Sequence, residues 1–295
     1  MSMKEEIIKL FDKGEIVKFT KVENYPELEK KYEIQKQLGI KTPFRDEDDV
    51  KFKLKDYFPE YNSIIVLGMQ YQLSKNISSE EVFLSSSSWG TDYHTVLRKK
   101  LGVISDYLRK HGYKSKIFVD NNELDERYIA YKAGLGFYGK NHLLINDLLG
   151  TNFFIGLLFT DALFVYDKEV KKTCLSCNKC INACPTNALG KEVLDVGKCL
   201  SYLTQKKNLT EEEKEEFNNC IYGCDICSNV CPHNKNVEKT TNFLPTGIEF
   251  IKVKDYKHLS NKEWNEKYKN SSCSWRGRNV FERNINIYKE KLEKK

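Results

Sequence analysis

The first 173 residues of this 295-residue chain contain no cysteine, proline occurs only 6 times, and no long apolar run is present. The longest apolar stretch, Asn152 to Phe164, is interrupted by a glycine, a threonine and an aspartate. It is therefore shorter than the roughly 18–20 residues that cross a bilayer. Charged residues run through the first fifteen positions, which lack the apolar centre of a signal peptide. These absences lead us to expect a cytoplasmic protein with no membrane partner.

The overall composition is that of a globular protein. Hydrophobic residues make up 40% of the chain, charged residues 31% and aromatic residues 12%, which is enough apolar material for a buried core. The low glycine and proline content excludes a collagen-like chain. The length suits one large domain or two modest ones.

Positive charge is concentrated towards the carboxyl end. Residues 251–295 contain 13 lysines and arginines against 6 acidic residues, a net charge of +7, whereas the whole chain has a net charge of +6. One interpretation is a solvated, lysine-rich segment. The other is a surface that faces phosphate groups, because basic segments attract polyanions and release their condensed counterions.

The distribution of apolar residues predicts an α+β fold in three regions. These are an α/β domain over residues 1–165, a cysteine-rich domain over 166–240, and a basic, helical closing segment over 241–295 that packs on the rest. Ser63 to Tyr71 is apolar and β-branched, as expected of a buried strand. Tyr93 to His111 has apolar residues at helical spacing and ends before Gly112. Further strands are expected at 116–120, 143–145 and 153–159 in the same sheet, and a helix at 126–133.

Nine of the ten cysteines lie within 58 residues, from Cys174 to Cys231. In a reducing cytosol, clustered thiols indicate metal ligands rather than disulfides. The first group has the ferredoxin spacing C-x2-C-x2-C-x3-C-P, in which three thiolates hold one [4Fe–4S] cluster and the fourth belongs to a second cluster. The members of this group are Cys174, Cys177, Cys180 and Cys184.

A second cysteine group, Cys224, Cys227 and Cys231, also ends in proline and repeats the later part of the pattern. If the last cysteine of each group serves the cluster of the other group, one cluster is expected on Cys174, Cys177, Cys180 and Cys231. The other cluster is expected on Cys184, Cys224 and Cys227, completed by Cys199 or Cys220. Structural zinc is the alternative metal, but zinc sites need no interlocked runs with Cys-Pro ends. Cys273 is isolated and is expected to be a buried thiol.

A ferredoxin-like domain joined to a larger α/β domain predicts that electrons are delivered to a second redox centre. Residues 133–142 (AGLGFYGKNH) contain G-x-G-x-x-G, but the motif follows a helix rather than a strand, so it is a weak dinucleotide signature. Its glycines fit either the close approach of a large flat ligand to the backbone or a turn that needs a positive φ.

Four stretches together resemble the epoxyqueuosine reductases, cobalamin-dependent enzymes that complete queuosine in the tRNA anticodon. The stretches are Trp89–His94 (WGTDYH), Val119–Arg127 (VDNNELDER), Ala133–Asn141 (AGLGFYGKN) and Ile221–Pro232 (IYGCDICSNVCP). Ser201–Thr204 and the pair Arg283–Asn284 fit the same pattern. The resemblance runs from about Phe44 to Asn286. The family commonly continues into a helical-repeat domain that binds tRNA, and we expect a short form without it.

The resemblance implies a nitroreductase-like α/β domain that binds base-off cobalamin, followed by a double [4Fe–4S] domain. The absence of D-x-H-x-x-G, the usual sign of a cobalt-ligating histidine, agrees with the base-off form. The resemblance also favours Cys199 as the eighth cluster ligand, and it places the family's proton donor at Asp120. The residues it places near the corrinoid are Asp92, Tyr93, His94, Gly134, Gly136, Gly139, Lys140 and Asn141.

Asp120 and His94 also have a structural interpretation. Asp120 ends an expected strand and would cap the following turn, and His94 would be a histidine satisfied by hydrogen bonds. Glu126 and Arg127 match the family too, but we expect them to anchor the start of a helix.

The expected reaction is reduction of the epoxide of epoxyqueuosine in tRNA, with Asp120 protonating the departing oxygen as a general acid. Electrons are expected to come from a low-potential donor such as ferredoxin or flavodoxin and to pass through the two clusters to the corrinoid. Two alternatives remain open. One is a corrinoid reductase of a small molecule, for example a halogenated compound, and the other is a non-catalytic electron carrier, in which Asp120 would be expendable.

Overall fold

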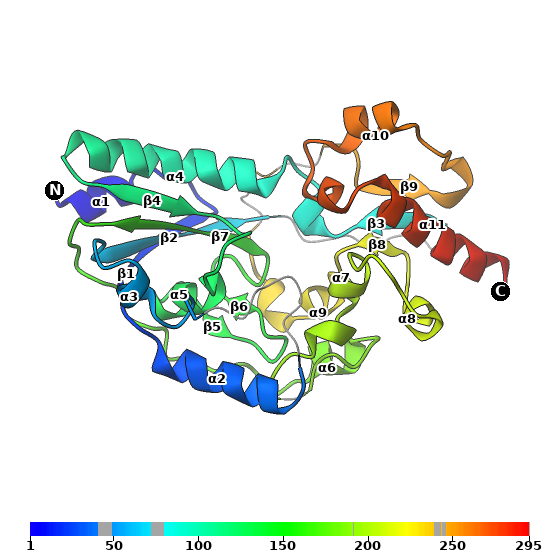
Figure 1. Ribbon diagram of the computed structural model, residues 1–295, viewed down its shortest axis with the longest axis horizontal. Helices are drawn as coiled ribbons and strands as arrows, with labels where there is room; N and C mark the ends of the chain where they lie inside the picture. The colour runs from blue at the N-terminus through cyan, green and yellow to red at the C-terminus, as the bar shows by residue number, and fades with distance from the viewer. Residues whose placement is uncertain (41–48, 72–79, 191, 239–242, 244–245, 295) are drawn as a thin grey trace. The chain divides into compact units, whose positions relative to one another are not determined.

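The computed structural model describes residues 1–40, 49–71, 80–190, 192–238, 243 and 246–294 (Figure 1). The chain forms two compact units, each assembled from three stretches. The first unit comprises Met1–Gln70, His94–Asn178 and Pro232–Asn242, and the second comprises Tyr71–Tyr93, Lys179–Cys231 and Phe243–Lys295. The three regions predicted from the sequence are continuous, whereas both units are discontinuous. The difference lies mainly in residues 71–93, which join the second unit, and in residues 166–178 and 232–242, which join the first. Most of the cysteine-rich region and the closing segment share the second unit.

The first unit is built on a four-stranded antiparallel sheet with the order β1-β2-β7-β4. Its strands are β1 (Glu15–Lys21), β2 (Ser63–Gln70), β4 (Ser115–Phe118) and β7 (Phe153–Thr160). Every residue of β2 is buried, as its continuous apolar run predicts for a strand covered on both faces. The strands expected at 63–71, 116–120 and 153–159 are confirmed.

Helices cover both faces of this sheet (Figure 1). On one face, α4 (Tyr93–Lys110) buries Leu97, Leu101, Ile104 and Leu108. It packs close to β7, because a Cβ added at Gly156 would lie 2.9 Å from Leu101 Cδ1. The opposite face carries α2 (Pro26–Gln37), α3 (Leu54–Tyr57) and α5 (Glu126–Lys132), whose apolar side chains join one core with β2, β4 and β7. The helices expected at 93–111 and 126–133 are confirmed, whereas β1 and α2 had no sequence prediction.

One predicted strand belongs to a different sheet. Residues 143–145 were expected to extend the main sheet, but β6 (Leu144–Ile145) pairs only with β5 (Phe137–Tyr138) in a two-stranded hairpin. The reason is a tight turn in which the His142 N–H donates to the Gly139 carbonyl and the Gly139 N–H donates to the Leu143 carbonyl. This turn folds the glycine-rich stretch back on itself.

The second unit contains a three-stranded sheet with the order β8-β3-β9. Its central strand, β3 (Glu81–Leu84), pairs in parallel with β8 (Cys220–Tyr222) and antiparallel with β9 (Phe250–Lys252). A short segment from early in the chain thereby joins the second cysteine group to the closing segment. No sequence pattern predicts this pairing, because β3 lies more than 100 residues from β8 and from β9 in the chain.

Aromatic packing stabilises the closing segment. Trp264 and Tyr268 of α10 (Asn261–Tyr268) contact Phe281 of α11 (Arg278–Glu293), with ring centroids 4.7 and 5.0 Å from that of Phe281. The segment is therefore largely helical, as expected, with β9 as its exception; residues 241–242, 244–245 and 295 of it lie outside the described part of the chain. Short helices complete the two units: α1 (Met3–Ile8) in the first, and α6 (Lys179–Ala183), α7 (Leu200–Leu203), α8 (Glu211–Glu215) and α9 (Ile226–Asn229) in the second.

Among the described residues, no helix combines the length and apolar character needed to cross a bilayer.

Candidate active site and metal centres

Asp120 lies in a left-handed turn just beyond β4. Its φ is +41° and that of Asn121 is +46°, a conformation that aspartate and asparagine adopt more readily than other side-chain-bearing residues. Two consecutive residues in this region cost free energy, of order 1–3 kcal/mol each, and persist only where surrounding contacts hold them. Such a turn places the Asp120 carboxyl group clear of the strand.

The Asp120 carboxylate faces a histidine of the same unit. Oδ2 of Asp120 lies 3.3 Å from Nε2 of His94, in the first turn of α4. The side chain of His94 is 22% exposed and that of Asp120 is 47% exposed. Nδ2 of Asn121 also lies 3.3 Å from His94 Nε2. The structure thus brings together two residues predicted for the site, and the carboxyl group stays accessible.

Glu126 holds the backbone of the Asp120 turn. Its Oε1 accepts hydrogen bonds from the Asp120 N–H, at 2.8 Å, and from Nδ2 of Asn122, also at 2.8 Å. Nδ2 of Asn122 in addition donates to the Asp120 carbonyl. Glu126 was expected to anchor a helix start. It lies in the first turn of α5, but its carboxylate is directed to the turn that carries the candidate acid.

The glycine-rich stretch is close-packed against protein atoms. A Cβ added at Gly134, where φ is +73°, would lie 2.1 Å from the Lys168 carbonyl oxygen, and one at Gly136 would lie 2.4 Å from that of Ile145. One added at Gly139 would lie 2.5 Å from Oδ1 of Asn141. These glycines therefore allow the chain to pack against itself. All three glycines are buried.

Lys140 and Asn141 follow the glycines and have different surroundings. Nζ of Lys140 donates to Oδ1 of Asn178, at 2.6 Å, in the loop that carries Cys177. Asn141 is 5% exposed, and within the described part of the chain its Nδ2 has no hydrogen-bond partner. A buried amide group without an acceptor is costly, so this position calls for a bound acceptor.

The other two residues predicted near a corrinoid, Asp92 and Tyr93, belong to the second unit. The Asp92 N–H donates to the Asn270 carbonyl, at 2.6 Å. This contact joins the segment before α4 to the turn between α10 and α11.

No disulfide joins any of the ten cysteines, all of which lie in the described part of the chain. Cys174 and Cys177 lie near the end of the second stretch of the first unit. The other predicted ligands belong to the second unit. Cys177 is exposed, whereas Cys180 and Cys231 are 8% and 9% exposed. The remaining predicted ligands are of intermediate exposure: Cys174, Cys184, Cys199, Cys224 and Cys227.

Within the second unit, thiols from both cysteine groups lie near one another. Burial, together with smaller contributions from the nearby thiols of Cys199, Cys180 and Cys184, raises the pKa of Cys227 to about 12. Burial also raises the pKa of Cys224, with a contribution from Cys199. Clustered cysteine thiolates are the usual ligands of a cationic iron–sulfur core.

Cys220 and Cys273 have other surroundings. Cys220 is 1% exposed, its Sγ–H faces the carbonyls of Tyr222 and Gly223, and burial raises its pKa well above the usual value. The nearby thiol of Cys224 also contributes to the raised pKa of Cys220. Cys273 is 2% exposed and accepts a hydrogen bond from Ser271, as expected of a buried thiol.

Arg283 and Asn284 support the cysteine segments from α11. Nδ2 of Asn284 donates to the carbonyls of Thr204 and Ile221, which follow Cys199 and precede Cys224 respectively. Nη1 of Arg283 donates to the carbonyls of Lys206 and Lys207. These hydrogen bonds give a structural reason for the Arg-Asn pair that the sequence comparison singled out.

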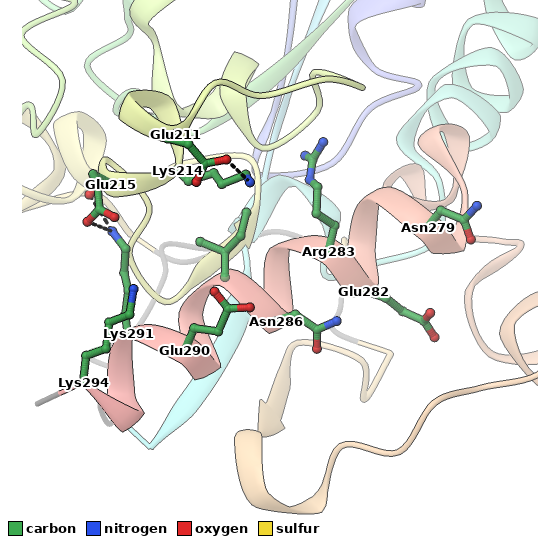
Figure 2. Close-up of a pocket in the computed structure, with 11 residues that line it drawn as sticks. Glu211, Lys214, Glu215, Asn279, Glu282, Arg283, Asn286, Glu290, Lys291 and Lys294 are labelled. Atoms are coloured by element: carbon green, nitrogen blue, oxygen red, sulfur yellow. Dashed lines mark hydrogen bonds and ion pairs between the residues drawn. The ribbon is translucent and has the colours of Figure 1, made fainter.

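A cavity of about 440 Å³ lies between α8 and α11 in the second unit. Figure 2 shows that its charged side chains are of both signs and that Glu211 pairs with Lys214 and Glu215 with Lys291. Four acidic and four basic residues line it, and none of the predicted site residues does. Its balanced charge favours no ion, so it is not the candidate active site.

Two family models match the chain. Residues 52–121 match the family described as epoxyqueuosine reductase QueG. Residues 173–234 match a 4Fe–4S double cluster binding domain. The second match contains all eight predicted cluster ligands as well as Cys220.

Known proteins are similar over almost the whole chain. An epoxyqueuosine reductase from Lactococcus garvieae is 36% identical, over 96% of this chain and 85% of the relative. A crystal structure of epoxyqueuosine reductase with a tRNA-Tyr epoxyqueuosine-modified stem loop has a TM-score of 0.88 and 30% identity, covering 97% of this chain and 79% of that one. A Bacillus subtilis structure, in which a catalytic loop named for an aspartate is swung out of the active site, has a TM-score of 0.87 and 30% identity, covering 97% and 80%. These matches confirm the mixed α+β fold.

Proposed function

Because this chain belongs to the epoxyqueuosine reductase family, we propose that it reduces the epoxide of epoxyqueuosine in tRNA to give queuosine, using two [4Fe–4S] clusters and base-off cobalamin. Removal of an epoxide oxygen to leave an alkene takes two electrons and two protons and releases water. The observation that carries the proposal is an accessible acid, Asp120, held in a turn beside His94 in a chain that also has a double cluster domain.

Asp120 is the proposed general acid. Its carboxyl group is 47% exposed, so a substrate oxygen can reach it. Proton donation to the departing oxygen lets a neutral hydroxyl leave, and such catalysis is typically worth 10²–10⁴-fold in rate. His94 and Glu126 hold the donor at its carboxylate and at its backbone N–H respectively.

The donor set suits two iron–sulfur clusters. The proposed ligands of one are Cys174, Cys177, Cys180 and Cys231, and those of the other are Cys184, Cys199, Cys224 and Cys227. Proximity of the Cys199 thiol to both Cys224 and Cys227 supports Cys199 as the eighth ligand. Cys220 instead directs its thiol to backbone carbonyls. Bound clusters supply one-electron transfer.

The corrinoid is proposed to lie against the glycine-rich stretch and His94. The unpartnered amide of Asn141 supports this, because the amide side chains and the phosphate of cobalamin offer acceptors. Backbone groups of Gly134, Gly136 and Gly139, together with Lys140, would complete this part of the site, and Asp92 and Tyr93 are further proposed contacts. A reduced corrinoid, when bound, supplies the electrons that open the epoxide.

The proposed partners are tRNA and a low-potential electron donor such as ferredoxin or flavodoxin, all within the cytoplasm. Support for tRNA comes from the relative solved with a modified stem loop. The net charge of +7 over residues 251–295 would help to attract phosphate groups. We expect tRNA binding to weaken steeply as salt is added.

The test is conversion of the nucleoside itself. Protein prepared without oxygen and loaded with iron, sulfide and cobalamin is mixed with a strong reductant and epoxyqueuosine-containing tRNA, and the digested nucleosides are identified by mass spectrometry. Queuosine is expected to accumulate with multiple turnovers, and only when cobalamin is supplied. Unchanged epoxyqueuosine alongside dehalogenation of a halogenated phenol would instead indicate a small-molecule reductase. No turnover of either would indicate an electron carrier.

A further inference from the structure

Asp225 is a buried carboxylate between two proposed cluster ligands. It separates Cys224 from the start of α9, which carries Cys227, and it is 6% exposed. Its Oδ2 accepts a hydrogen bond from the Ser86 N–H, at 2.7 Å. The two residues are 139 positions apart in the chain, so this contact fixes the cysteine loop against a distant segment of the same unit.

The segment that holds Asp225 is itself firmly packed. Ser86 is fully buried and begins a short 3-10 turn, Ser86–Ser88. Next to it, the Ser85 N–H donates to the Tyr222 carbonyl, at 2.8 Å. A Cβ added at Gly223, where φ is +75°, would lie 2.1 Å from Oγ of Ser85. The Asp225 carboxylate is therefore buried and held in place by a hydrogen bond from a packed segment.

A negative charge on Asp225 would act on a cluster held by its neighbours. Asp225 directly follows Cys224 and stands two positions before Cys227 in the chain. Such a charge opposes an added electron, because both are negative. In a buried site this interaction is much less screened than in water.

We propose that Asp225 is a positioning residue that holds the Cys224–Cys227 loop through Ser86 and lowers the reduction potential of the cluster bound there. Donation of a backbone N–H to a carboxylate favours its ionised form. Net charge near a cluster and hydrogen bonding around it are among the determinants of its potential. This proposal rests on the cluster binding in the proposed function, and it needs neither cobalamin nor tRNA.

A lower potential would serve the proposed reaction. Electrons that leave this cluster must reduce a strongly reducing centre, and a carboxylate beside the cluster makes its reduced form a better donor. No sequence prediction involved Asp225, although an acidic residue inside a C-x2-C step is a signal for such a role.

The test is a redox titration followed by electron paramagnetic resonance on the full chain, loaded with iron and sulfide and free of cobalamin and tRNA. Asp225→Asn keeps the shape and an acceptor oxygen for Ser86 but removes the charge. We expect the midpoint potential of one of the two clusters to shift to a more positive value, while that of the other stays in place. Asp225→Glu, which restores the charge, is expected to titrate near the unaltered protein.

The matched control is Glu212→Gln, which removes a carboxylate from an exposed position on α8 of the same unit. It is expected to leave both midpoints unchanged. If Asp225→Asn binds less iron than the unaltered protein, Asp225→Ser, smaller and also uncharged, takes its place with the same expected shift. If a fully iron-loaded neutral variant has the same midpoint potentials as the unaltered protein, the proposal is overturned. That result would not bear on epoxide reduction.

Discussion

His94 and Asp120 form a pair within the first unit. Nε2 of the imidazole lies 3.3 Å from Oδ2 of the carboxylate. One residue lies in the first turn of α4 and the other in the turn after β4. The main sheet, which α4 packs against and β4 belongs to, fixes the places from which both side chains extend. The contact therefore connects the core of the unit to its candidate acid.

Replacement of the acid tests its chemical role. Asp120→Asn retains the size of the side chain and can still contact His94, but it has no acidic proton to donate. Epoxide reduction is expected to fall by about 10²–10⁴-fold, with iron content and cobalamin binding unchanged. Nucleoside mass spectrometry measures the first, and iron analysis with absorbance spectra measures the others. Turnover close to that of the unaltered protein would discard Asp120 as the general acid.

His94 is expected to act through Asp120. His94→Gln removes the imidazole, and misplacement of the acid should lower kcat by roughly 10- to 100-fold. Because both residues serve the same proton transfer, the double variant His94→Gln/Asp120→Asn should be no slower than Asp120→Asn alone. Losses that multiply in the double variant would show that His94 has a separate role, for instance at the cofactor.

A matched pair of variants tests whether the hydrogen bonds to Glu126 hold the Asp120 turn in place. Glu126→Ala removes the acceptor for the Asp120 N–H and for Asn122, so the left-handed turn loses its support. A fall in kcat of about 10²-fold is expected. Glu126→Gln keeps the acceptor oxygen and should retain most of the activity. Equal activities of the two variants at matched thermal stability would contradict this role, because only Glu126→Gln keeps the acceptor oxygen.

The eighth cluster ligand is tested by comparing two alanine variants. Cys199→Ala should lower the iron content from about eight atoms per chain towards about four, since one cluster loses a ligand. Cys220→Ala should keep the full iron content, because that thiol faces the carbonyls of Tyr222 and Gly223. Iron and sulfide analysis after anaerobic reconstitution provides the measurement. The opposite pattern would exchange the two assignments.

Local patterns were sufficient for part of this fold. The apolar run at β2, the helical spacing in α4 and the glycine after α5 each reflect a period or a terminator that acts within a few residues. The prediction that β6 extends the main sheet was wrong, because the turn at Gly139–His142, rather than strand propensity, decides its pairing partner.

Contacts between distant segments could not be predicted from such patterns. The addition of β3 to the sheet of the second unit and the bond between Ser86 and Asp225 join residues more than 100 positions apart. Within the site, the cysteine spacing and the position of Asp120 were visible in the sequence. The role of Glu126 was not, because it depends on a left-handed turn that places a backbone N–H beside its carboxylate.

The most direct measurement of the central claim is a spectral titration of cobalamin into iron-loaded protein under strict exclusion of oxygen. The account predicts saturation near one cobalamin per chain, with the absorbance of the base-off form, and weaker binding in Asn141→Leu, which lacks the unpartnered amide. A protein that holds its full iron and leaves the cobalamin spectrum unchanged at every concentration would contradict it.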